Sequence, residues 1–251
     1  MIQTLRPLIQ RFDSLPSTNT EAARAAAHGA PEGLCIVAAE QTAGRGRRER
    51  TWLSPAGAGL YFSIVLRPQL DAALWPLLTL MAALAVHDAL RDACTLVCDI
   101  KWPNDILANE RKLCGILAET VETKTGRACI LGIGINLLDG AFPPDLRDVA
   151  TSIEAAAQRA PDTEAVLQAL TRNIAEHYRR LHTADGAREL VTEWTARSSF
   201  ATGKFVRVAL CDEIFEGTTR GLEQDGALRV ETHAGELKII RAGDVTALRG
   251  K

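Results

Sequence analysis

The hydrophobic period of this chain changes once, near residue 200, and that change restricts the folds it can adopt. Before it, the patterns over 163–181 and 187–196 predict amphipathic helices. After it, apolar and polar residues alternate in short segments, at 205–208, 214–219, 227–231, 237–240 and 245–248. With turns at Asp225–Gly226 and Ala234–Gly235, these segments predict short antiparallel strands that close into a small β-barrel.

The longer part of the chain, before this change, mixes strand and helix patterns. Short apolar runs predict strands at 8–12, 34–39, 60–66, 96–102, 112–119 and 128–138. Longer patterns predict helices at 18–28 and 72–92, the second apolar on almost every side and therefore buried. This mixture of helices and strands is typical of an α+β fold. The small polar stretch Ser198–Gly203 is typical of a hinge, so we expect two domains, 1–200 and 201–251.

Net charge, apolar segments and cysteine spacing argue against several classes of function. A net charge of −2 over 251 residues argues against a general nucleic-acid binder, whose basic surface should dominate. Arg6 and Pro7 interrupt the first apolar residues, so no secretory signal is expected. The apolar segment 74–86 is too short to span a bilayer. Cysteines occur at 35, 94, 98, 114, 129 and 211 without metal-ligand spacing, which predicts reduced thiols in a cytoplasmic protein and no metal site.

The strongest local signal is the arginine loop, which we define as residues 44–50, following the predicted strand at 34–39. Gly44 and Gly46 flank Arg45, and four arginines fall between 45 and 50. Glycines allow close backbone approach, and arginine forks suit phosphate and carboxylate. The loop therefore predicts an anion site. The alternative is solvated charge or a nucleic-acid patch.

The loop is not one of the common nucleotide motifs. Glu49 occupies the third glycine position of a dinucleotide fingerprint, and the chain has no G-x-x-x-x-G-K-[ST] sequence. Upstream, Ser17-Thr18-Asn19 precedes an alanine-rich helix pattern. Thr18 and Glu21 have capping-box spacing, which favours a structural role, whereas a helix N-terminus also offers hydroxyl and N–H groups to a polar ligand. Both roles stay open at this point.

Five polar stretches lie at strand ends or turns, where binding sites tend to occur. They are Ser17-Thr18-Asn19, Gln41 with the arginine loop, Lys101-Trp-Pro-Asn-Asp105, Arg111-Lys112-Leu-Cys-Gly115 and Gly132-Ile-Gly-Ile-Asn136. In this order and spacing they resemble the biotin–protein ligases, also called biotin–[acetyl-CoA-carboxylase] ligases. The resemblance extends from about Phe12 to Leu248.

The resemblance implies a fold and a reaction. The fold is a class II synthetase-like mixed sheet with helices, followed by a Src-homology-3-like barrel. The reaction joins biotin and ATP as biotinyl-5'-AMP and then transfers the biotinyl group to a lysine of a carboxylase's biotin carboxyl carrier domain. A lipoate–protein ligase, with related adenylate chemistry, is the nearest alternative.

The resemblance also assigns residues to roles. It gives catalytic roles to Lys112 and Arg47. The positions matching biotin contacts are Ser17, Thr18, Asn19, Gln41, Gly44, Arg45, Gly46, Arg47, Lys112 and Gly115. The positions matching the nucleotide pocket are Arg48, Trp52, Asn104, Asp105 and Asn136.

Several details stay open on the residues alone. We expect Mg²⁺ to arrive with ATP, because magnesium relies on substrate phosphates. Asp105 either contributes a carboxylate to it or accepts the proton of the acceptor lysine. The ligand motifs begin at Ser17, which leaves no room for a DNA-binding domain, so we expect no DNA-binding role. Glu49 stands where the family loop often has glycine. We expect no membrane partner, and homodimerisation is left open.

Overall fold

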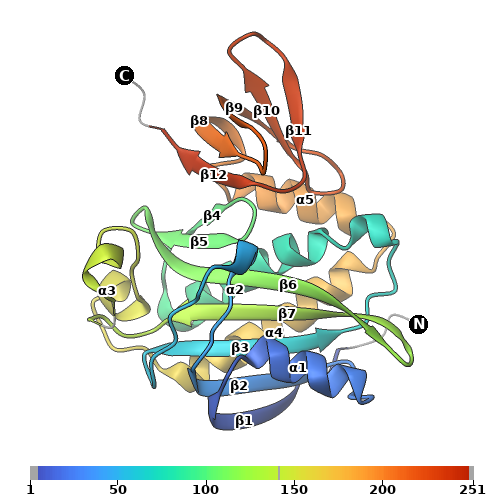
Figure 1. Ribbon diagram of the computed structural model, residues 1–251, viewed down its shortest axis with the longest axis vertical. Coiled ribbons are helices and arrows are strands. Elements are labelled where there is room, and N and C mark those ends of the chain that lie inside the picture. The colour runs from blue at the N-terminus through green and yellow to red at the C-terminus, as the bar shows by residue number, and fades with distance from the viewer. Residues whose placement is uncertain (1–4, 141, 249–251) are drawn as a thin grey trace.

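The computed structural model describes residues 5–140 and 142–248. The strands of its larger sheet are β1 (Leu8–Leu15), β2 (Leu34–Gln41), β3 (Gly59–Leu66), β4 (Asp99–Lys101), β5 (Asp105–Ala108), β6 (Arg111–Thr123) and β7 (Gly126–Asn136). They are hydrogen-bonded in the order β1-β2-β3-β7-β6-β5-β4, and β1 runs parallel to β2 while the other pairs are antiparallel (Figure 1). The predicted mixed sheet is confirmed.

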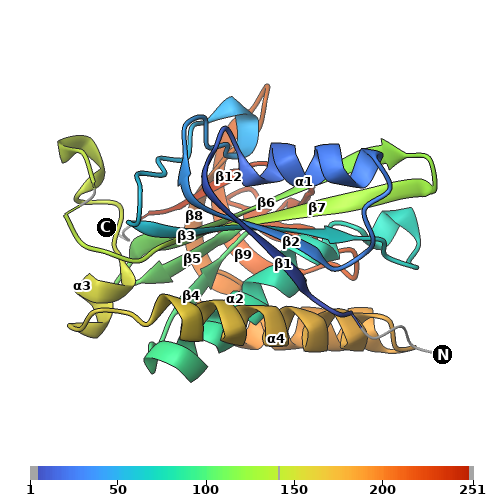
Figure 2. The same ribbon diagram turned by 90° about the horizontal axis from the view of Figure 1, so that it is seen from below.

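Helices cover both faces of this sheet. They are α1 (Thr18–Ala27), α2 (Leu77–Cys94), α3 (Ile153–Ala157), α4 (Thr163–Leu181) and α5 (Gly186–Ala196). Figure 2 shows α1 on one face and α2 with α4 on the other. Helix α1 lies close to the sheet, because the small residues Ala22 and Ala26 pack directly on Ile36, Val65 and Ile130. That small-residue contact keeps the N-terminus of α1 close to the sheet.

The core lies on the other face. All eight residues of β3 are buried, which explains its continuous apolar sequence, because both faces of a central strand are covered. Helix α2 is apolar nearly all round because it contacts the sheet, α4 and α5, and α4 buries a stripe including Leu167, Leu170 and Ile174. Fully burying such a side chain contributes about 1.5–3 kcal/mol.

Some predicted boundaries are wrong. The helix predicted at 72–92 begins at Leu77, since a separate 3₁₀ turn, Ala72–Leu74, is capped by Asp71 and followed by Trp75-Pro76. The strand predicted at 96–102 is confined to Asp99–Lys101. The pattern did not predict β5 or α3, because four- and five-residue elements lack a measurable period.

The C-terminal strands form a second, antiparallel sheet. They are β8 (Thr202–Ala209), β9 (Ile214–Leu222), β10 (Leu228–Thr232), β11 (Leu237–Ile240) and β12 (Asp244–Ala247), in the order β11-β10-β9-β8-β12. The alternation after residue 203 is therefore confirmed as strand structure. Within residues 202–248, no ladder pairs β11 with β12, so the closed barrel that we expected is not seen as hydrogen bonding.

The predicted hinge is held by specific bonds. The Ser198 hydroxyl is buried and donates to the Ile100 carbonyl, and Ser199 donates from its backbone N–H to Asp99 at 2.8 Å. The buried Trp102 indole N–H donates to the Gly226 carbonyl at 3.0 Å. These bonds fix the C-terminal sheet against the turn that follows β4. In the described part of the chain, no helix is long and apolar enough to cross a membrane.

Five of the six cysteines are buried free thiols, as expected, whereas Cys211 is exposed. Burial raises the pKa of Cys35, Cys98 and Cys129 to about 12. These thiols therefore stay protonated at neutral pH and pack as small apolar groups.

A charged network joins α2, α4 and α5. Asp88 accepts from Arg197 at 2.6 Å and lies 2.8 Å from His177 Nε2 and 2.9 Å from Arg91. Arg197 also bonds Glu193. Burial by itself raises the pKa of Asp88, but the bond from His177 and the charges of Arg197 and Arg91 outweigh it, so the pKa lies well below its usual range.

We expect Asp88→Asn to reduce the free energy of unfolding by about 3 kcal/mol at pH 7, because it leaves the partly buried Arg197 and the buried His177 without the carboxylate that they contact. The folded-state pKa is depressed, so this stabilisation is complete above the unfolded pKa of about 4 and is lost as pH falls below it. Urea unfolding at several pH values measures both effects. Asp92→Asn, one turn away and half-exposed, is the matched control. Equal destabilisation by the two variants would contradict the assignment.

Candidate active site

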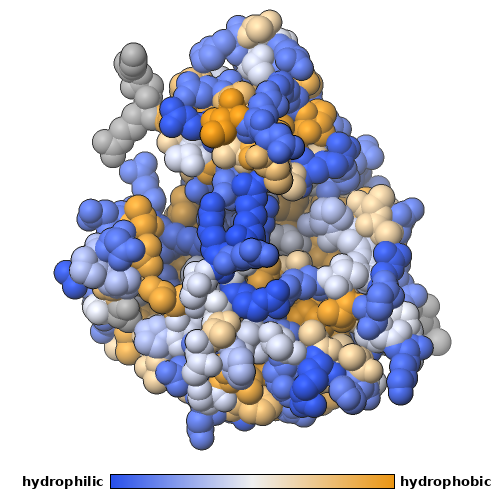
Figure 3. All heavy atoms as spheres, in the orientation of Figure 1, coloured by the Kyte–Doolittle hydropathy of each residue, from blue (hydrophilic) through white to orange (hydrophobic). Residues whose placement is uncertain are grey.

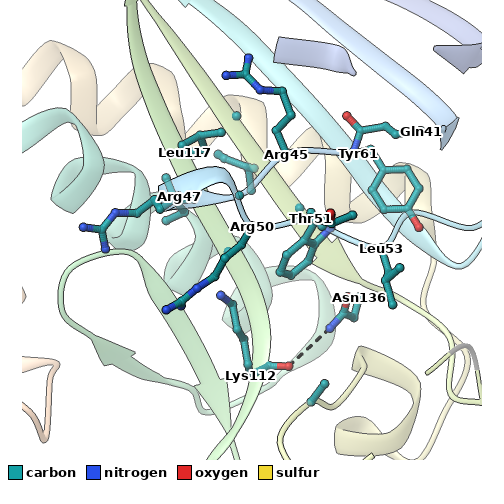
Figure 4. Close-up of a pocket in the computed structure, with 18 of the residues that line it drawn as sticks. Gln41, Arg45, Arg47, Arg50, Thr51, Leu53, Tyr61, Lys112, Leu117 and Asn136 are labelled. Atoms are coloured by element: carbon teal, nitrogen blue, oxygen red, sulfur yellow. Dashed lines mark hydrogen bonds between the residues drawn. The ribbon is translucent and has the colours of Figure 1, made fainter. Parts of the chain in front are cut away.

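A cavity of about 270 Å³ opens between the arginine loop and the sheet face that carries α1. Figure 3 shows hydrophilic residues gathered at the centre of the molecule, beneath the C-terminal sheet. In Figure 4, Arg47, Arg50 and Lys112 gather at one end of the cavity, and Gln41 and Tyr61 lie at the other. The two ends therefore differ in charge, one cationic and one neutral.

The neutral end is built from the N-terminus of α1. The Thr18 backbone N–H and hydroxyl both donate to Gln41 Oε1, at 2.8 and 3.1 Å, and Gln41 Nε2 donates to Ser54 Oγ at 2.8 Å. Ser17 occupies the N-cap position, yet within the described residues its side chain makes no capping bond. The capping-box expectation for Thr18 and Glu21 is wrong, because Thr18 bonds Gln41 and Glu21 pairs with Arg24. The Ser17 hydroxyl lies on the cavity wall instead.

Asn19 is held by a second polar group. Its Oδ1 lies 2.6 Å from the Ser63 hydroxyl and its Nδ2 donates to Glu119 at 2.8 Å. Arg45 forms a two-pronged pair with the same Glu119, at 2.7 and 3.2 Å. A Cβ at Gly132 would lie 2.1 Å from Asn19 Oδ1. This glycine, inside a strand, is what allows Asn19 to reach the cavity.

Trp52 lies over the middle of the site. A Cβ at Gly134 would lie 2.5 Å from its indole Nε1, and one at Gly115 would lie 3.0 Å from its ring. Lys112 Nζ lies 5.3 Å from the centre of the indole ring, within cation–π range. The indole Nε1 is buried and has no hydrogen-bond partner among the residues that the structure describes. Such an unpaired donor in a cavity wall points to a ligand acceptor.

Lys112 is fixed at both ends. Its backbone N–H donates to the Val149 carbonyl at 2.8 Å, and its carbonyl accepts from Thr151 at 2.9 Å. Its Nζ lies 2.7 Å from Asp105 Oδ1. Asn136 Nδ2 donates to the Thr151 carbonyl at 2.9 Å and points to the Lys112 carbonyl (Figure 4). The segment after β7 thus holds the lysine in place.

The arginine loop contacts the C-terminal sheet. Arg47 donates to Asn104 Oδ1 at 3.0 Å and to the Gly243 carbonyl at 3.4 Å. Arg48 and Arg50 both pair with Asp244. Burial lowers the pKa of Arg47, and the charge of Asp244 partly offsets that effect. The guanidinium still stays charged at neutral pH, because the ordinary pKa of arginine lies far above 7. The cationic end is thus shared by both domains.

Most residues predicted from the sequence meet in this cavity. Its wall includes Ser17, Thr18, Asn19, Gln41, Arg45, Gly46, Arg47, Trp52, Asn104, Asp105, Lys112, Gly115 and Asn136. Gly44 is not among the wall residues. Its carbonyl accepts from the Trp52 backbone N–H, and the neighbouring atoms leave no space for a Cβ at Gly44. Arg48 is not among the wall residues, and it pairs with Asp244 and donates to the Ala209 carbonyl.

Sequence reasoning missed the partners of these residues. Ser63 and Glu119 lie within segments predicted only as strands, and Asp244 directly precedes the strand predicted at 245–248. Glu119 had one available signal, as a charged residue following the apolar run of β6. The apolar part of the wall was also missed, and it includes Leu53, Tyr61, Phe62, Leu117, Leu138, Phe142, Leu146 and Val149.

This arrangement suits a ligand with a neutral polar head, an apolar body and an anionic end. The neutral hydrogen-bonding groups lie at Thr18 and Gln41, apolar side chains follow, and the lysine and arginines come last. Cations that converge on one point stabilise negative charge that develops during a reaction. The site therefore fits chemistry at a carboxylate or phosphate.

Comparison with known proteins agrees with this geometry. Residues 11–136 match the model of the biotin/lipoate A/B protein ligase family, and residues 202–246 match the biotin protein ligase C-terminal domain. The chain is 39% identical to the bifunctional ligase/repressor BirA of Bacillus subtilis, over 92% of this chain and 71% of that protein. It is 36% identical to the biotin–[acetyl-CoA-carboxylase] ligase of Paracoccus denitrificans, over 91% and 96%.

The fold comparison extends over both domains. A biotin protein ligase from Aquifex aeolicus, solved in complex with biotin and ATP, superimposes with a TM-score of 0.84 at 28% identity, covering 96% of this chain and 99% of that chain. The fold and site define a ligase that acts on carboxylic acids. The chain belongs to the biotin/lipoate A/B protein ligase family, and within it to the biotin–protein ligases.

We expect Gly132→Ala to lower the free energy of unfolding by about 1–3 kcal/mol, because its methyl group overlaps Asn19 Oδ1. In an Asn19→Ala background, the same substitution should cost much less, since the overlapping atoms are gone. Urea unfolding of the four proteins in this double-mutant cycle measures the coupling. Additive effects would show that Gly132 does not make room for Asn19.

Proposed function

We propose that this chain activates biotin with ATP as biotinyl-5'-AMP and transfers the biotinyl group to a lysine of a biotin carboxyl carrier domain. This proposal rests on one observation: a single cavity contains the neutral polar groups of Thr18 and Gln41 and the cationic groups of Lys112 and Arg47. Biotin has a neutral polar ring system and an acidic tail, and this polarity matches the cavity from end to end.

The neutral end is proposed to bind the biotin ring. Ser17, Thr18, Asn19 and Gln41 offer donors and acceptors there, and Gly115 lets the ligand lie close to the sheet. The arginine loop, through its glycines and its first two arginines, covers the ligand. Exclusion of water protects the reactive adenylate, which is a mixed anhydride.

The cationic end is proposed to bind the nucleotide. Lys112 lies where one point charge can contact both the biotin carboxylate and the α-phosphate, and Arg47 supplies a planar fork for phosphate oxygens. The residues proposed to line the nucleotide pocket are Arg48, Trp52, Asn104, Asp105 and Asn136. The unpaired Trp52 indole N–H supports this assignment.

In the first step, a biotin carboxylate oxygen attacks the α-phosphorus and pyrophosphate leaves. In the second, the acceptor lysine amine attacks the biotinyl carbonyl carbon and AMP leaves with the bonding electrons. The lysine must lose a proton, since its ordinary pKa is about 10.4. Asp105 is the carboxylate in the wall beside Lys112, and we propose it as the proton acceptor.

Mg²⁺ is proposed to enter with ATP. Asp105 is the acidic side chain in this wall from the larger domain, but it already pairs with Lys112 at 2.7 Å. Its charge is therefore largely matched, and the ion would rely on phosphate oxygens and water for most of its ligands.

Other features remain predictions. We propose domain limits of 1–200 for the catalytic unit and 201–251 for the C-terminal unit. The pairing of the last strand, β12, with the first, β8, and the bulge in β9 where it pairs with β10 favour a sheet that curls toward a Src-homology-3-like barrel. A cytoplasmic location and the use of a carboxylase carrier as partner follow from the proposed reaction. Homodimerisation and a lack of DNA binding stay predictions too.

Pyrophosphate release from ATP tests the proposal. We expect release to depend on biotin, because the neutral end of the cavity offers several hydrogen-bonding groups that a biotin ring can use and a dithiolane ring cannot. Lipoate in place of biotin should support little release. Release with lipoate but not with biotin would favour the lipoate–protein ligase alternative, which the family model also includes.

We expect Lys112→Ala to slow adenylate formation about a hundredfold, which corresponds to roughly 3 kcal/mol of transition-state stabilisation. The physical reason is the loss of the charge that offsets repulsion between two anionic substrates. Single-turnover formation of biotinyl-5'-AMP measures it. Lys124→Ala, in the exposed turn between β6 and β7, is the control. An undiminished rate in Lys112→Ala, with the fold intact, would remove Lys112 from the mechanism.

A further inference from the structure

The arginine loop is docked on one rung of the C-terminal sheet. Residues Ala209 and Asp244 are register partners of β8 and β12. The Ala209 carbonyl accepts from Arg48 at 3.4 Å, and the carboxylate of Asp244 pairs with both Arg48 and Arg50. Next to it, the Gly243 carbonyl accepts from Arg47. Three arginines of the loop thus contact the C-terminal sheet at Gly243, at Asp244 and at Ala209, which is the residue paired with Asp244.

The backbone of the loop is strained where it docks. Arg48 and Glu49 have φ angles of 54° and 60°, a left-handed conformation that costs a non-glycine residue roughly 1 kcal/mol or more. Such a conformation persists only when contacts around it hold it in place. For Arg48, the contacts in question are those with Asp244 and Ala209.

The carboxylate of Asp244 lies in the wall of the cavity itself, beside the cationic end. It is about three-quarters buried, and two guanidinium groups converge on it. Two arginine forks on one anion is also the arrangement in which they would hold a phosphate group. Asp244 therefore lies where an anionic group of a ligand would meet Arg48 and Arg50.

We propose that Asp244 is a positioning residue that docks the arginine loop on the C-terminal sheet when the site is empty and gives way to polyphosphate. Nucleotide affinity is then set by competition between one carboxylate and the phosphate oxygens for Arg48 and Arg50. The role rests on the proposed function for the identity of the ligand. Its consequence is that the C-terminal domain governs both closure of the loop and affinity for the nucleotide.

This competition predicts the direction in which polyphosphate affinity should change when Asp244 is neutralised. A polyphosphate must displace the carboxylate, and it approaches a negative charge that stays in the wall. Removing that charge with Asp244→Asn frees both arginines and lifts the repulsion. Since partly exposed ion pairs contribute about 0.2–1 kcal/mol each and two pairs are involved, polyphosphate should bind roughly two- to thirtyfold more tightly. A residue needed only for folding would weaken binding instead.

The first experiment titrates inorganic tripolyphosphate into the intact empty protein by calorimetry. We expect about fivefold tighter binding to Asp244→Asn than to wild type. Asp225→Asn is the matched control, since Asp225 lies in the same sheet and pairs with Arg241, away from the loop. Arg50→Gln provides the second background, in which Asp244→Asn should have a smaller effect, because one of the two competing pairs is already absent.

The second experiment follows trypsin cleavage after the arginines of the loop. The empty Asp244→Asn protein should be cut about fivefold faster than wild type, and tripolyphosphate should protect both. In steady state, KM for ATP should fall while KM for biotin stays constant. Loss of stability alone would raise both KM values and lower Tm.

Weaker or unchanged tripolyphosphate binding in Asp244→Asn, at wild-type Tm, overturns the competition. Unchanged cleavage of the empty loop overturns the docking. These results are separable from failure of the proposed function. If wild type releases no pyrophosphate with biotin, while Asp244→Asn still binds tripolyphosphate more tightly and is cut faster, the role of Asp244 stands and the substrate assignment falls.

Discussion

The structure depends on holding several cations together at one end of a cavity. Lys101, Lys112, Arg47 and Arg50 lie within electrostatic range of one another, and burial lowers the pKa of Lys101 and of Arg47. Asp105 from the larger domain and Asp244 from the smaller one offset this charge. Mutual repulsion of cations would otherwise push the loop and the strand ends apart. The two carboxylates therefore hold these cations close together, in the arrangement that anionic substrates need.

This charge arrangement explains why the two domains are joined as they are. The Trp102 indole N–H and the serines after α5 hold the C-terminal sheet at the turn following β4. These contacts place Asp244 beside the arginine loop, which is distant from it in the sequence. Rigid contact between the domains is a condition for a shared site, because an ion pair is effective only at short distance. The small domain contributes to the site chemistry through one rung of its sheet.

Several features of the fold were predictable, and others were not, for identifiable reasons. The strand at Leu34–Gln41 and the helix at Thr163–Leu181 have clear periods, and both were predicted closely. The helix beginning at Leu77 was predicted to start too early, because Ala72–Leu74 is apolar yet forms a separate turn. Within the site, Lys112 and the arginine loop were found through motifs. Glu119 and Asp244 were not, since each acts only through a partner far away in the sequence.

The sequence by itself determined most of the alternating and helical segments and the polar motifs that meet in the cavity. Each of these depends on residues close together along the chain. Only the tertiary structure shows that Gly132 and Gly134 leave space for Asn19 and Trp52. It alone also shows that Thr18 bonds Gln41 rather than capping its helix, and that Asp244 contacts the arginine loop. Those outcomes depend on distances across the fold, which local periodicity does not encode.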